Sequence, residues 1–276
     1  MINIDQHVHS MISHDGISTI SEYMNSAKNY NIKEITFTEH YDDYNGIDTI
    51  LKTLNVDEYK KRYYENKDDN LLKTNFGIEL GLRPESYDLI SNMVKNNHFD
   101  FIIGSSHITC GKDISHDKTF FEELSPHQAI RNYLNEVLEN IKLYKKEFDV
   151  YGHIDYVIRY IIKYYGNVMT RIDYNEFKEI LDEILKSIIK DDKGVEINTS
   201  GIRYGLDSCH PNIEIIKRYK ELGGKIITIG SDAHRVEDLS SNFDIVYDML
   251  ETIQFDTITI YHDRIPDLIK IKHLKK

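Results

Sequence analysis

The sequence predicts an α/β fold in which parallel strands close, or nearly close, into a barrel with a metal site at their C-terminal ends. Strand-like and helix-like segments alternate seven times along the 276 residues. Polar residues that could bind a ligand follow nearly every predicted strand. An open doubly wound sheet would gather its ligands in one crevice, whereas contributions from seven strand ends favour a closed sheet. The chain has no Gly-x-Gly-x-x-Gly or Gly-x-x-x-x-Gly-Lys-Ser/Thr motif, so a nucleotide-binding turn is not supported.

The first half of the chain is predicted to hold four strands, because apolar residues there alternate or run together between turn signals. These strands cover residues 2–7, 34–38, 73–80 and 99–105. Capping boxes and prolines mark the predicted helices. The helices cover 19–30 (opened by Thr19 and Glu22), 57–67, 84–96 (opened by Pro84) and 125–148 (opened by Ser125 and Pro126). The polar and aromatic segment 41–70 is interpreted as an insertion over the site, and 108–124 as a loop.

The second half repeats this pattern. Its predicted strands cover residues 149–151, 195–198, 225–229 and 257–261, the last followed by a basic tail. Its predicted helices cover 173–190, capped by Asp173 with Glu176 at capping-box distance, then 211–222, ended by Gly223-Gly224, and 242–252. No low-complexity linker or composition break interrupts the chain. We therefore expect one domain over residues 1–276.

Composition limits the classes of function. The 34 basic and 46 acidic residues give a net charge of -12, which argues against a long nucleic-acid surface but not against an anionic small molecule. The two cysteines are too few for a disulfide scaffold, and the N-terminus has no signal-peptide pattern. No apolar run reaches about 18 residues, so no membrane span is expected. We expect a cytoplasmic protein, and the sequence leaves the oligomeric state open.

The stretch from Asp5 to His14, Asp-Gln-His-Val-His-Ser-Met-Ile-Ser-His, contains the first candidate metal ligands. If it begins as a strand, its period of two places Asp5, His7 and His9 on one side. Polar residues at the other strand ends extend this pattern. The full candidate set is His7, His9, His14, His40, Glu79, His107, His153, Asp232 and His234.

Taken singly, each of these histidines could be a solvated loop residue or a hydrogen-bonded buried one. Together they indicate a metal centre. Imidazole and carboxylate ligands without thiolates suit zinc, manganese or iron(II), and a carboxylate can bridge two ions. Nine ligands are too many for one ion and suit three.

These motifs, in this order, resemble the PHP (polymerase and histidinol phosphatase) family. The motifs are Asp-x-His-x-His, Thr-Glu-His, Gly-Ile-Glu, Gly-Ser-Ser-His, Gly-His-Ile-Asp, Glu-Ile-Asn-Thr-Ser-Gly-Ile-Arg and Gly-Ser-Asp-Ala-His, from Asp5 to about His234. The resemblance implies a distorted (β/α)7 barrel with a trinuclear metal centre. Within the family, the chain length and the motif from Glu196 to Arg203 are most similar to the monofunctional histidinol-phosphate phosphatases of histidine biosynthesis.

The resemblance also assigns roles to particular residues. It implies one ion held by His7, His9, Glu79 and Asp232, a second held by Glu79, His107 and His153, and a third held by His14, His40 and His234. Arg159 and Arg203 resemble the phosphate-binding arginines of the family, although either could instead form a surface ion pair. Asp5 is expected to orient a ligand histidine, and Glu39 to do the same for His40. Asn198 could contact substrate or support the barrel.

The expected reaction is hydrolysis of L-histidinol phosphate to L-histidinol and phosphate, with a hydroxide bridging two ions as nucleophile. Asp232 or His234 could protonate the leaving alkoxide. The alternatives are a related phosphoesterase acting on nucleotides, short oligonucleotides or phosphotyrosine, a non-catalytic metal-binding module, and a metal-dependent amidohydrolase. The segments 41–70 and 110–124, where substrate-selecting loops would fall, have no close match to the family.

Overall fold

Seven parallel strands form the central sheet of the computed structural model, which describes residues 3–68 and 70–275. They lie in the order β1-β2-β3-β4-β7-β8-β9, so neighbours in the sheet follow one another along the chain. The strands are β1 (Asn3–Val8), β2 (Ile32–Asp42), β3 (Lys73–Gly81), β4 (Phe101–Ser105), β7 (Val150–Tyr151), β8 (Gly194–Asn198) and β9 (Ile227–Gly230). Residue 2 of the first predicted strand lies outside the described residues.

The two edge strands of this sheet approach each other at their C-terminal ends. Val8 and Ala233 form an isolated parallel bridge, and the His9 N–H donates to the Ala233 carbonyl at 2.8 Å. The Asp232 N–H donates to the His7 carbonyl, also at 2.8 Å. The sheet is therefore nearly closed into a barrel, which confirms the predicted fold class.

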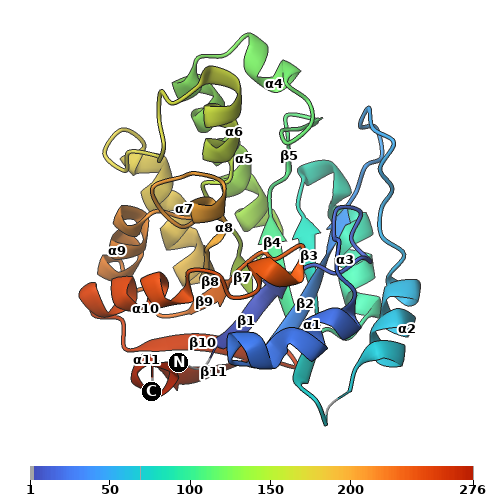
Figure 1. Cartoon of the computed structure of the whole chain (residues 1–276). Helices are drawn as coiled ribbons and strands as arrows, with labels where there is room; N and C mark the ends of the chain where they lie inside the picture. Colours follow the sequence, from blue (N-terminus) through green and yellow to red (C-terminus); the bar gives the residue numbers. More distant parts are fainter. Residues whose placement is uncertain (1–2, 69, 276) are drawn as a thin grey trace.

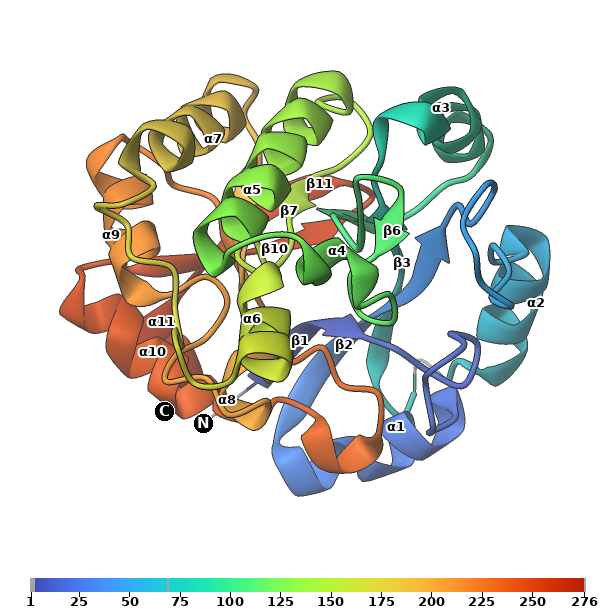
Figure 2. The same cartoon turned by 90° about the horizontal axis from the view of Figure 1, so that it is seen from above.

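Helices surround the strands (Figure 2). The longer ones are α1 (Ile20–Ser26), α2 (Val56–Asn66), α3 (Tyr87–Asn96), α5 (Pro126–Leu143), α6 (Val157–Tyr165), α7 (Lys178–Lys190), α9 (Ile213–Glu221) and α10 (Phe243–Thr252). The one-turn helices are α4 (Thr119–Glu122), α8 (Ser200–Arg203), α11 (Ile271–Leu274), and the 3₁₀ turns η1 (Ala27–Tyr30), η2 (Pro84–Ser86) and η3 (Val236–Asp238). No described helix is long and apolar enough to cross a membrane.

Two of the predicted helix starts are capping boxes in the structure, at Thr19 and Ser125. The predicted start at Asp173 is wrong. Its Oδ1 accepts the Asn175 N–H at 2.8 Å and so stabilises a turn, and α7 begins only at Lys178. Helix α6 was not predicted, because it has no side-chain cap to mark its start.

Segment 41–70, interpreted from the sequence as an insertion over the site, reaches the site only at its start, where Asp42 and Tyr44 line a cavity at the C-terminal ends of the strands. Its helix α2 packs on the outside of the sheet, where the buried Tyr59 hydroxyl donates to the carbonyls of Phe37 and Gly77 at 2.9 Å each. The predicted loop 108–124 contains a small hairpin, β5 (Ile108–Thr109) and β6 (Lys112–Asp113). Figure 1 shows α4, which follows this hairpin, at the same end of the barrel as α6.

The opposite end of the barrel is covered by the C-terminal hairpin, β10 (Thr257–His262) and β11 (Ile265–Lys270), where a basic tail had been expected after one strand (Figure 1). The Gln6 side chain holds this hairpin by donating to the Thr259 carbonyl at 2.7 Å and accepting from the Tyr261 N–H at 3.2 Å. The Tyr261 ring stacks on Phe101 with a centroid distance of 5.1 Å. Apolar side chains thus fill this end, and the polar site is confined to the other.

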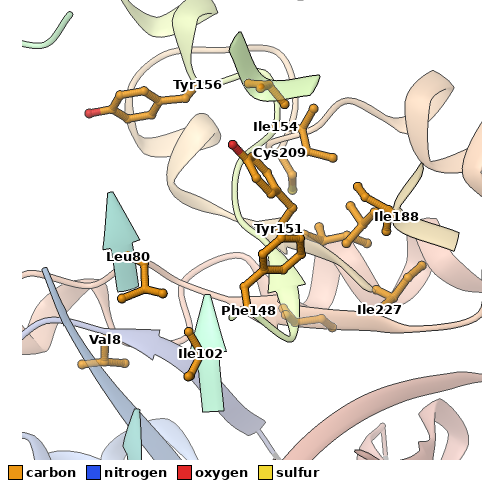
Figure 3. Close-up of a cluster of buried hydrophobic side chains, with 14 of the residues drawn as sticks. Val8, Leu80, Ile102, Phe148, Tyr151, Ile154, Tyr156, Ile188, Cys209 and Ile227 are labelled. Atoms are coloured by element: carbon orange, nitrogen blue, oxygen red, sulfur yellow. The ribbon is translucent and has the colours of Figure 1, made fainter. Parts of the chain in front are cut away.

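Buried apolar side chains from strands and helices form one large cluster around the sheet. Figure 3 shows part of this cluster, with Val8, Leu80 and Ile102 from the strands and the rings of Phe148 and Tyr151. In the same view, the Tyr156 ring lies at the edge of the cluster and its hydroxyl points away from the other labelled side chains. The apolar packing therefore continues up to the rim of the site. Each Å² of apolar surface that is buried contributes about 25 cal/mol of favourable free energy, so burial stabilises this arrangement.

Candidate metal centre

Glu79 lies at the centre of the candidate site. It is fully buried near the end of β3, and in the sheet register it is paired with His40 of β2. One carboxylate oxygen, Oε1, lies 2.8 Å from His153 Nε2 and 3.3 Å from His107 Nε2. The other, Oε2, lies within 3.4 Å of three imidazole nitrogens, those of His7, His9 and His40. Such a carboxylate is suited to bridge two metal ions.

The first predicted ligand set comes together around Glu79 Oε2. The Nε2 atoms of His7 and His9 are 3.0 Å apart, and Asp232 Oδ1 lies 3.4 Å from His9 Nε2 and 3.7 Å from His7 Nε2. His7, His9 and Glu79 form a group of donor atoms with the spacing of a metal site. The backbone of Asp232 is in the left-handed region, with φ of 55°, so the close approach of β1 and β9 is made through a strained residue.

The second predicted set is also brought together. Glu79, His107 and His153 form a group of donor atoms with metal-site spacing, and all three are buried. The sequence analysis assigned the same three residues to the second ion.

The third predicted set, His14, His40 and His234, is arranged differently from the other two. The donor group with metal-site spacing contains His9, His40 and His234. The His14 ring centroid lies 5.6 Å from that of His40, and its Nε2 lies 4.0 Å from Oδ2 of Asp15. The same Asp15 oxygen is 3.2 Å from His234 Nε2 and 3.7 Å from His40 Nε2. The three predicted ligands therefore surround the carboxylate of Asp15, a residue that the sequence analysis did not select.

The polar atoms of this centre fit divalent metal ions. Glu79 Oε2 and His40 Nδ1 are buried and 2.9 Å apart, but they are not aligned for a hydrogen bond with each other or with another described residue. His153 Nδ1 is likewise buried without a hydrogen bond to a described residue. Buried donors and acceptors without partners are costly, at about 1–3 kcal/mol each. Imidazole nitrogens and carboxylate oxygens that face one another across a few ångströms would be satisfied by a shared cation.

The charges within the centre shift its pKa values in opposite directions. Burial would raise the pKa of Glu79, but the imidazoles of His7, His107 and His40 hold it well below its usual value. Burial would lower the pKa of His107, but the carboxylates of Asp42 and Glu79 raise it to about 10. The carboxylate of Glu79 is therefore ionised and available as a ligand.

A carboxylate beneath the centre, Glu196, holds two of the histidines. Its Oε1 lies 2.5 Å from His7 Nδ1, and its Oε2 accepts the His153 N–H at 3.1 Å. A β-carbon at Gly230 would come within 2.5 Å of Glu196 Oε1 and 2.3 Å of the His7 Cβ, so only glycine allows this approach. No separate role was predicted for Glu196, although a carboxylate on a buried strand is an indication of one.

Two other predicted supporting residues act differently from expected. Asp5 accepts the backbone N–H groups of Ser231 and Ser240, at 2.9 and 2.8 Å, and contacts no imidazole ring. Glu39 accepts hydrogen bonds from the Ser13 hydroxyl and backbone. That hydroxyl lies 3.2 Å from His9 Nδ1, so Glu39 acts on His9 through Ser13 and does not orient the ring of His40.

The remaining supporting contacts involve Asp42 and Asn198. Asp42 Oδ1 lies 2.9 Å from His107 Nδ1, which fixes the direction of that ring. Asn198 is fully buried, and its Oδ1 accepts from the Ser200 N–H at 3.0 Å. Asn198 was predicted either to contact substrate or to support the barrel, and this contact favours support of the barrel.

A cavity of about 500 Å³ opens above the centre. Its lining includes Arg159, whose guanidinium donates to the Ser200 hydroxyl at 2.7 Å and lies 3.8 Å from the centroid of the Tyr204 ring. Nε of Arg159 is buried without a partner among the described residues. A guanidinium held by aromatic rings beside a metal centre is suited to bind an oxyanion.

Arg203 is not among the residues that line this cavity. Its guanidinium donates to the carbonyls of Ser231 and Asp232, at 2.6 and 2.9 Å, and to the Ser241 hydroxyl at 2.9 Å. This placement differs from the substrate contact expected from the sequence. Arg203 instead holds the loop that carries Asp232.

The fold and the site together define an α/β barrel protein with a histidine-rich divalent-metal centre. A family profile described as the PHP domain matches residues 5–200. The chain belongs to the PHP family.

Several known proteins are similar to this chain over most of its length. It is 31% identical to a histidinol-phosphatase of Lactococcus lactis over 242 residues, 85% of each chain. It is 29% identical to a protein of Clostridium acetobutylicum named "Probable histidinol-phosphatase", over 90% of this chain and 92% of that one. A crystal structure of histidinol phosphate phosphatase from Lactococcus lactis, in complex with zinc, L-histidinol and phosphate, superposes with a TM-score of 0.82 at 25% identity, covering 96% of this chain and 98% of that chain.

Proposed function

We propose that this protein is a metal-dependent phosphomonoesterase that hydrolyses L-histidinol phosphate to L-histidinol and phosphate, a reaction of histidine biosynthesis. The observation that carries this proposal is that an imidazole- and carboxylate-rich centre and the guanidinium of Arg159 line one cavity. Metal ions polarise the phosphoryl oxygens during hydrolysis, and an arginine binds the negatively charged oxygens by charge-assisted hydrogen bonds. The relatives named histidinol-phosphatase, and the solved structure that contains L-histidinol and phosphate, support this substrate.

The proposed cofactors are three divalent ions, with zinc, manganese and iron as the candidates. The ligand sets are those of the sequence analysis: His7, His9, Glu79 and Asp232; Glu79, His107 and His153; and His14, His40 and His234. When bound, such ions activate water near neutral pH and neutralise phosphoryl charge. The buried unpartnered atoms of Glu79, His40 and His153 support this assignment.

Arg159 is the proposed ligand of the phosphoryl oxygens. Its contacts with Ser200 and the Tyr204 ring fix the plane of the guanidinium before substrate binds. Its Nη2 lies 3.8 Å from Asp232 Oδ2, so the phosphate site adjoins the first ligand set. We propose that Arg203 contributes through the position of Asp232, since it binds the carbonyl of that residue.

The leaving alkoxide of histidinol needs a proton, because alkoxides are poor leaving groups. Asp232 and His234 both line the cavity, and one of them is the proposed donor. Oδ2 of Asp232 lies 3.1 Å from the Ser200 hydroxyl, and Nδ1 of His234 lies 3.0 Å from the Asp232 carbonyl, so both side chains are held in place.

The whole chain, residues 1–276, is proposed to form one barrel domain with a small-molecule substrate. Strand β9 supports this proposal, because it lies beyond the matched residues 5–200 yet pairs with β8 in the sheet. A substrate from amino-acid biosynthesis is consistent with activity in the cytoplasm.

Metal removal and reconstitution test the proposed function. The full chain is dialysed against a chelator and assayed for phosphate release from L-histidinol phosphate before and after addition of Zn²⁺, Mn²⁺ or Fe²⁺. We expect no measurable release from the metal-free protein and recovery with at least one of the three ions. Undiminished release by protein that contains no bound metal would overturn the proposal.

A further inference from the structure

The hairpin β5–β6 contributes a carboxylate, Asp113, to the wall of the cavity that contains the metal centre and Arg159. Asp113 is only 6% exposed. Its Oδ1 accepts the Ser115 N–H at 2.9 Å and the Ser115 hydroxyl, which fixes the carboxylate within a tight turn. Its Oδ2 has one weak contact, with His116 Nδ1 at 3.3 Å. One oxygen of Asp113 is therefore held by the turn, and the other is left for a further partner.

Three tyrosine rings share the cavity wall with this carboxylate. Tyr44, Tyr156 and Tyr160 also line the cavity. Burial raises the pKa of each of these hydroxyls, and the negative charge of Asp113 raises each of them further. The hydroxyls of Tyr156 and Tyr160 are 2.7 Å apart and hydrogen-bond to each other. Aromatic faces around a carboxylate make a site that favours an organic cation.

The two cationic side chains of the cavity wall bind other groups: Lys163 donates to the Ser115 carbonyl at 3.0 Å, and Arg159 donates to the Ser200 hydroxyl at 2.7 Å. Among the ion pairs of the described residues, the one partner of Asp113 is His116, whose side chain is 68% exposed. A cation on a ligand could donate to Oδ2 of Asp113, which has only the 3.3 Å contact with His116.

The cavity therefore offers groups of both signs to one ligand. Arg159 and the metal ligands suit a phosphoryl group, and Asp113 with its three tyrosines suits a cation. A phosphate ester of an amino alcohol carries both charges, because its primary amine is protonated near neutral pH. We propose that Asp113 binds the ammonium group of the substrate, and that this contact selects phosphate esters of amino alcohols over uncharged alkyl and aryl phosphates. This inference rests on the phosphomonoesterase function proposed above.

A single substitution isolates the charge of Asp113 from its structural role. In Asp113→Asn, the amide oxygen can still accept from Ser115, so the turn is kept and the negative charge is lost. Asp117→Asn is the matched control. Asp117 lies in the same loop, is half-buried, and holds Thr119 by the same kind of turn, with the N–H at 2.8 Å, but it does not line the cavity.

The variants are compared by kcat/KM on three substrates, at equal metal content: L-histidinol phosphate, its analogue without the amine, and p-nitrophenyl phosphate. We expect Asp113→Asn to lower kcat/KM for L-histidinol phosphate by about tenfold or more, as loss of a charged contact to substrate does. Values for the other two substrates, and all values for Asp117→Asn, should stay within about twofold of wild type.

Two results would overturn the inference. If Asp113→Asn lowers kcat/KM equally on all three substrates, Asp113 has only a structural role. If it changes none of them, the ammonium binds elsewhere. Failure of the proposed function looks different, because wild-type protein would then show no preference for L-histidinol phosphate over p-nitrophenyl phosphate.

Discussion

Nδ1 of His7 lies 2.5 Å from Oε1 of Glu196, although the two residues are 189 positions apart in the sequence. Both side chains are buried at the same end of the barrel. Because one ring nitrogen of His7 is occupied by the carboxylate, the other, Nε2, is directed toward Glu79 and His9. A carboxylate that fixes the tautomer and direction of a ligand imidazole also strengthens it as a ligand.

We therefore expect Glu196→Gln to lower the affinity for the most weakly bound ion by about 10- to 100-fold, because the amide cannot supply the negative charge. Competition with a chelator measures this affinity. Asp5→Asn is the matched control, since Asp5 is also fully buried, within β1, but accepts from the backbone N–H groups of Ser231 and Ser240 and contacts no imidazole ring. Equal loss of affinity in both variants would show that Glu196 has no specific effect on His7.

The bridging position of Glu79 leads to a second prediction. In Glu79→Gln, one oxygen of the carboxylate becomes an NH₂ group, which cannot ligate an ion, so at least one ion per chain should be lost. Turnover should fall by about a hundredfold or more, as when a main electrostatic group of a site is removed. Metal analysis and phosphate release measure the two effects on the same sample. Full metal content with retained activity would contradict the bridging role.

The two arginines should differ in their mutant behaviour. Arg159→Lys removes the planar guanidinium that stacks on Tyr204, and should raise the inhibition constant for inorganic phosphate by about tenfold with little change in melting temperature. Arg203→Lys removes hydrogen bonds to Ser231 and Asp232, and should lower the melting temperature by several degrees, for a loss of about 1–2 kcal/mol. The reverse pattern, with phosphate binding sensitive only at position 203, would contradict these assignments.

Glu136, on α5 outside the metal centre, gives a prediction for pH. Burial raises its pKa to about 7, with further repulsion from Glu85 and Glu139, although it accepts the Cys110 N–H at 2.7 Å. Its pKa is higher in the folded than in the unfolded chain, so the folded state favours the protonated form. The stability that this group contributes is therefore present below about pH 4.5 and is lost as the pH rises to about 7.

Glu136→Gln does not titrate, so its free energy of unfolding relative to wild type should rise by about 1–3 kcal/mol between pH 5 and pH 8. Urea unfolding of the metal-free proteins at both pH values measures this difference. Glu179→Gln, on the exposed face of α7, serves as the control and should show no such change. A difference that is independent of pH would exclude titration of Glu136 in this range.

Much of the fold could be predicted because its signals are local. Alternation of apolar residues marks the strands, and the side chains at Thr19 and Ser125 make the capping boxes that the sequence indicates. Helix α6 has no side-chain cap, and Asp173 has the residue type of a cap but binds Asn175 in a turn. A pattern of residue types does not distinguish a helix cap from an isolated turn.

The candidate ligands could be selected from the sequence because parallel strands bring their C-terminal ends to one face of a barrel. The contacts of Asp15, Asp42 and Glu196 could not be predicted from the sequence. Each of them depends on the register and twist of strands that are distant in the sequence. The loop with Asp113 was recognised only as a region of substrate selection. The turn at Asp113 directs one carboxylate oxygen away from Ser115. This geometry depends on the folded structure and could not be predicted from the residue types.

The central claim is that this metal centre hydrolyses L-histidinol phosphate. The most direct measurement is kcat/KM for phosphate release by the metal-replete protein, on L-histidinol phosphate and on a panel of nucleotides, sugar phosphates and aryl phosphates. We expect a preference for L-histidinol phosphate of about a hundredfold or more, which corresponds to about 2.7 kcal/mol of transition-state discrimination. A flat profile, or a better nucleotide substrate, would contradict the proposed substrate and leave a metal-dependent phosphoesterase of another specificity.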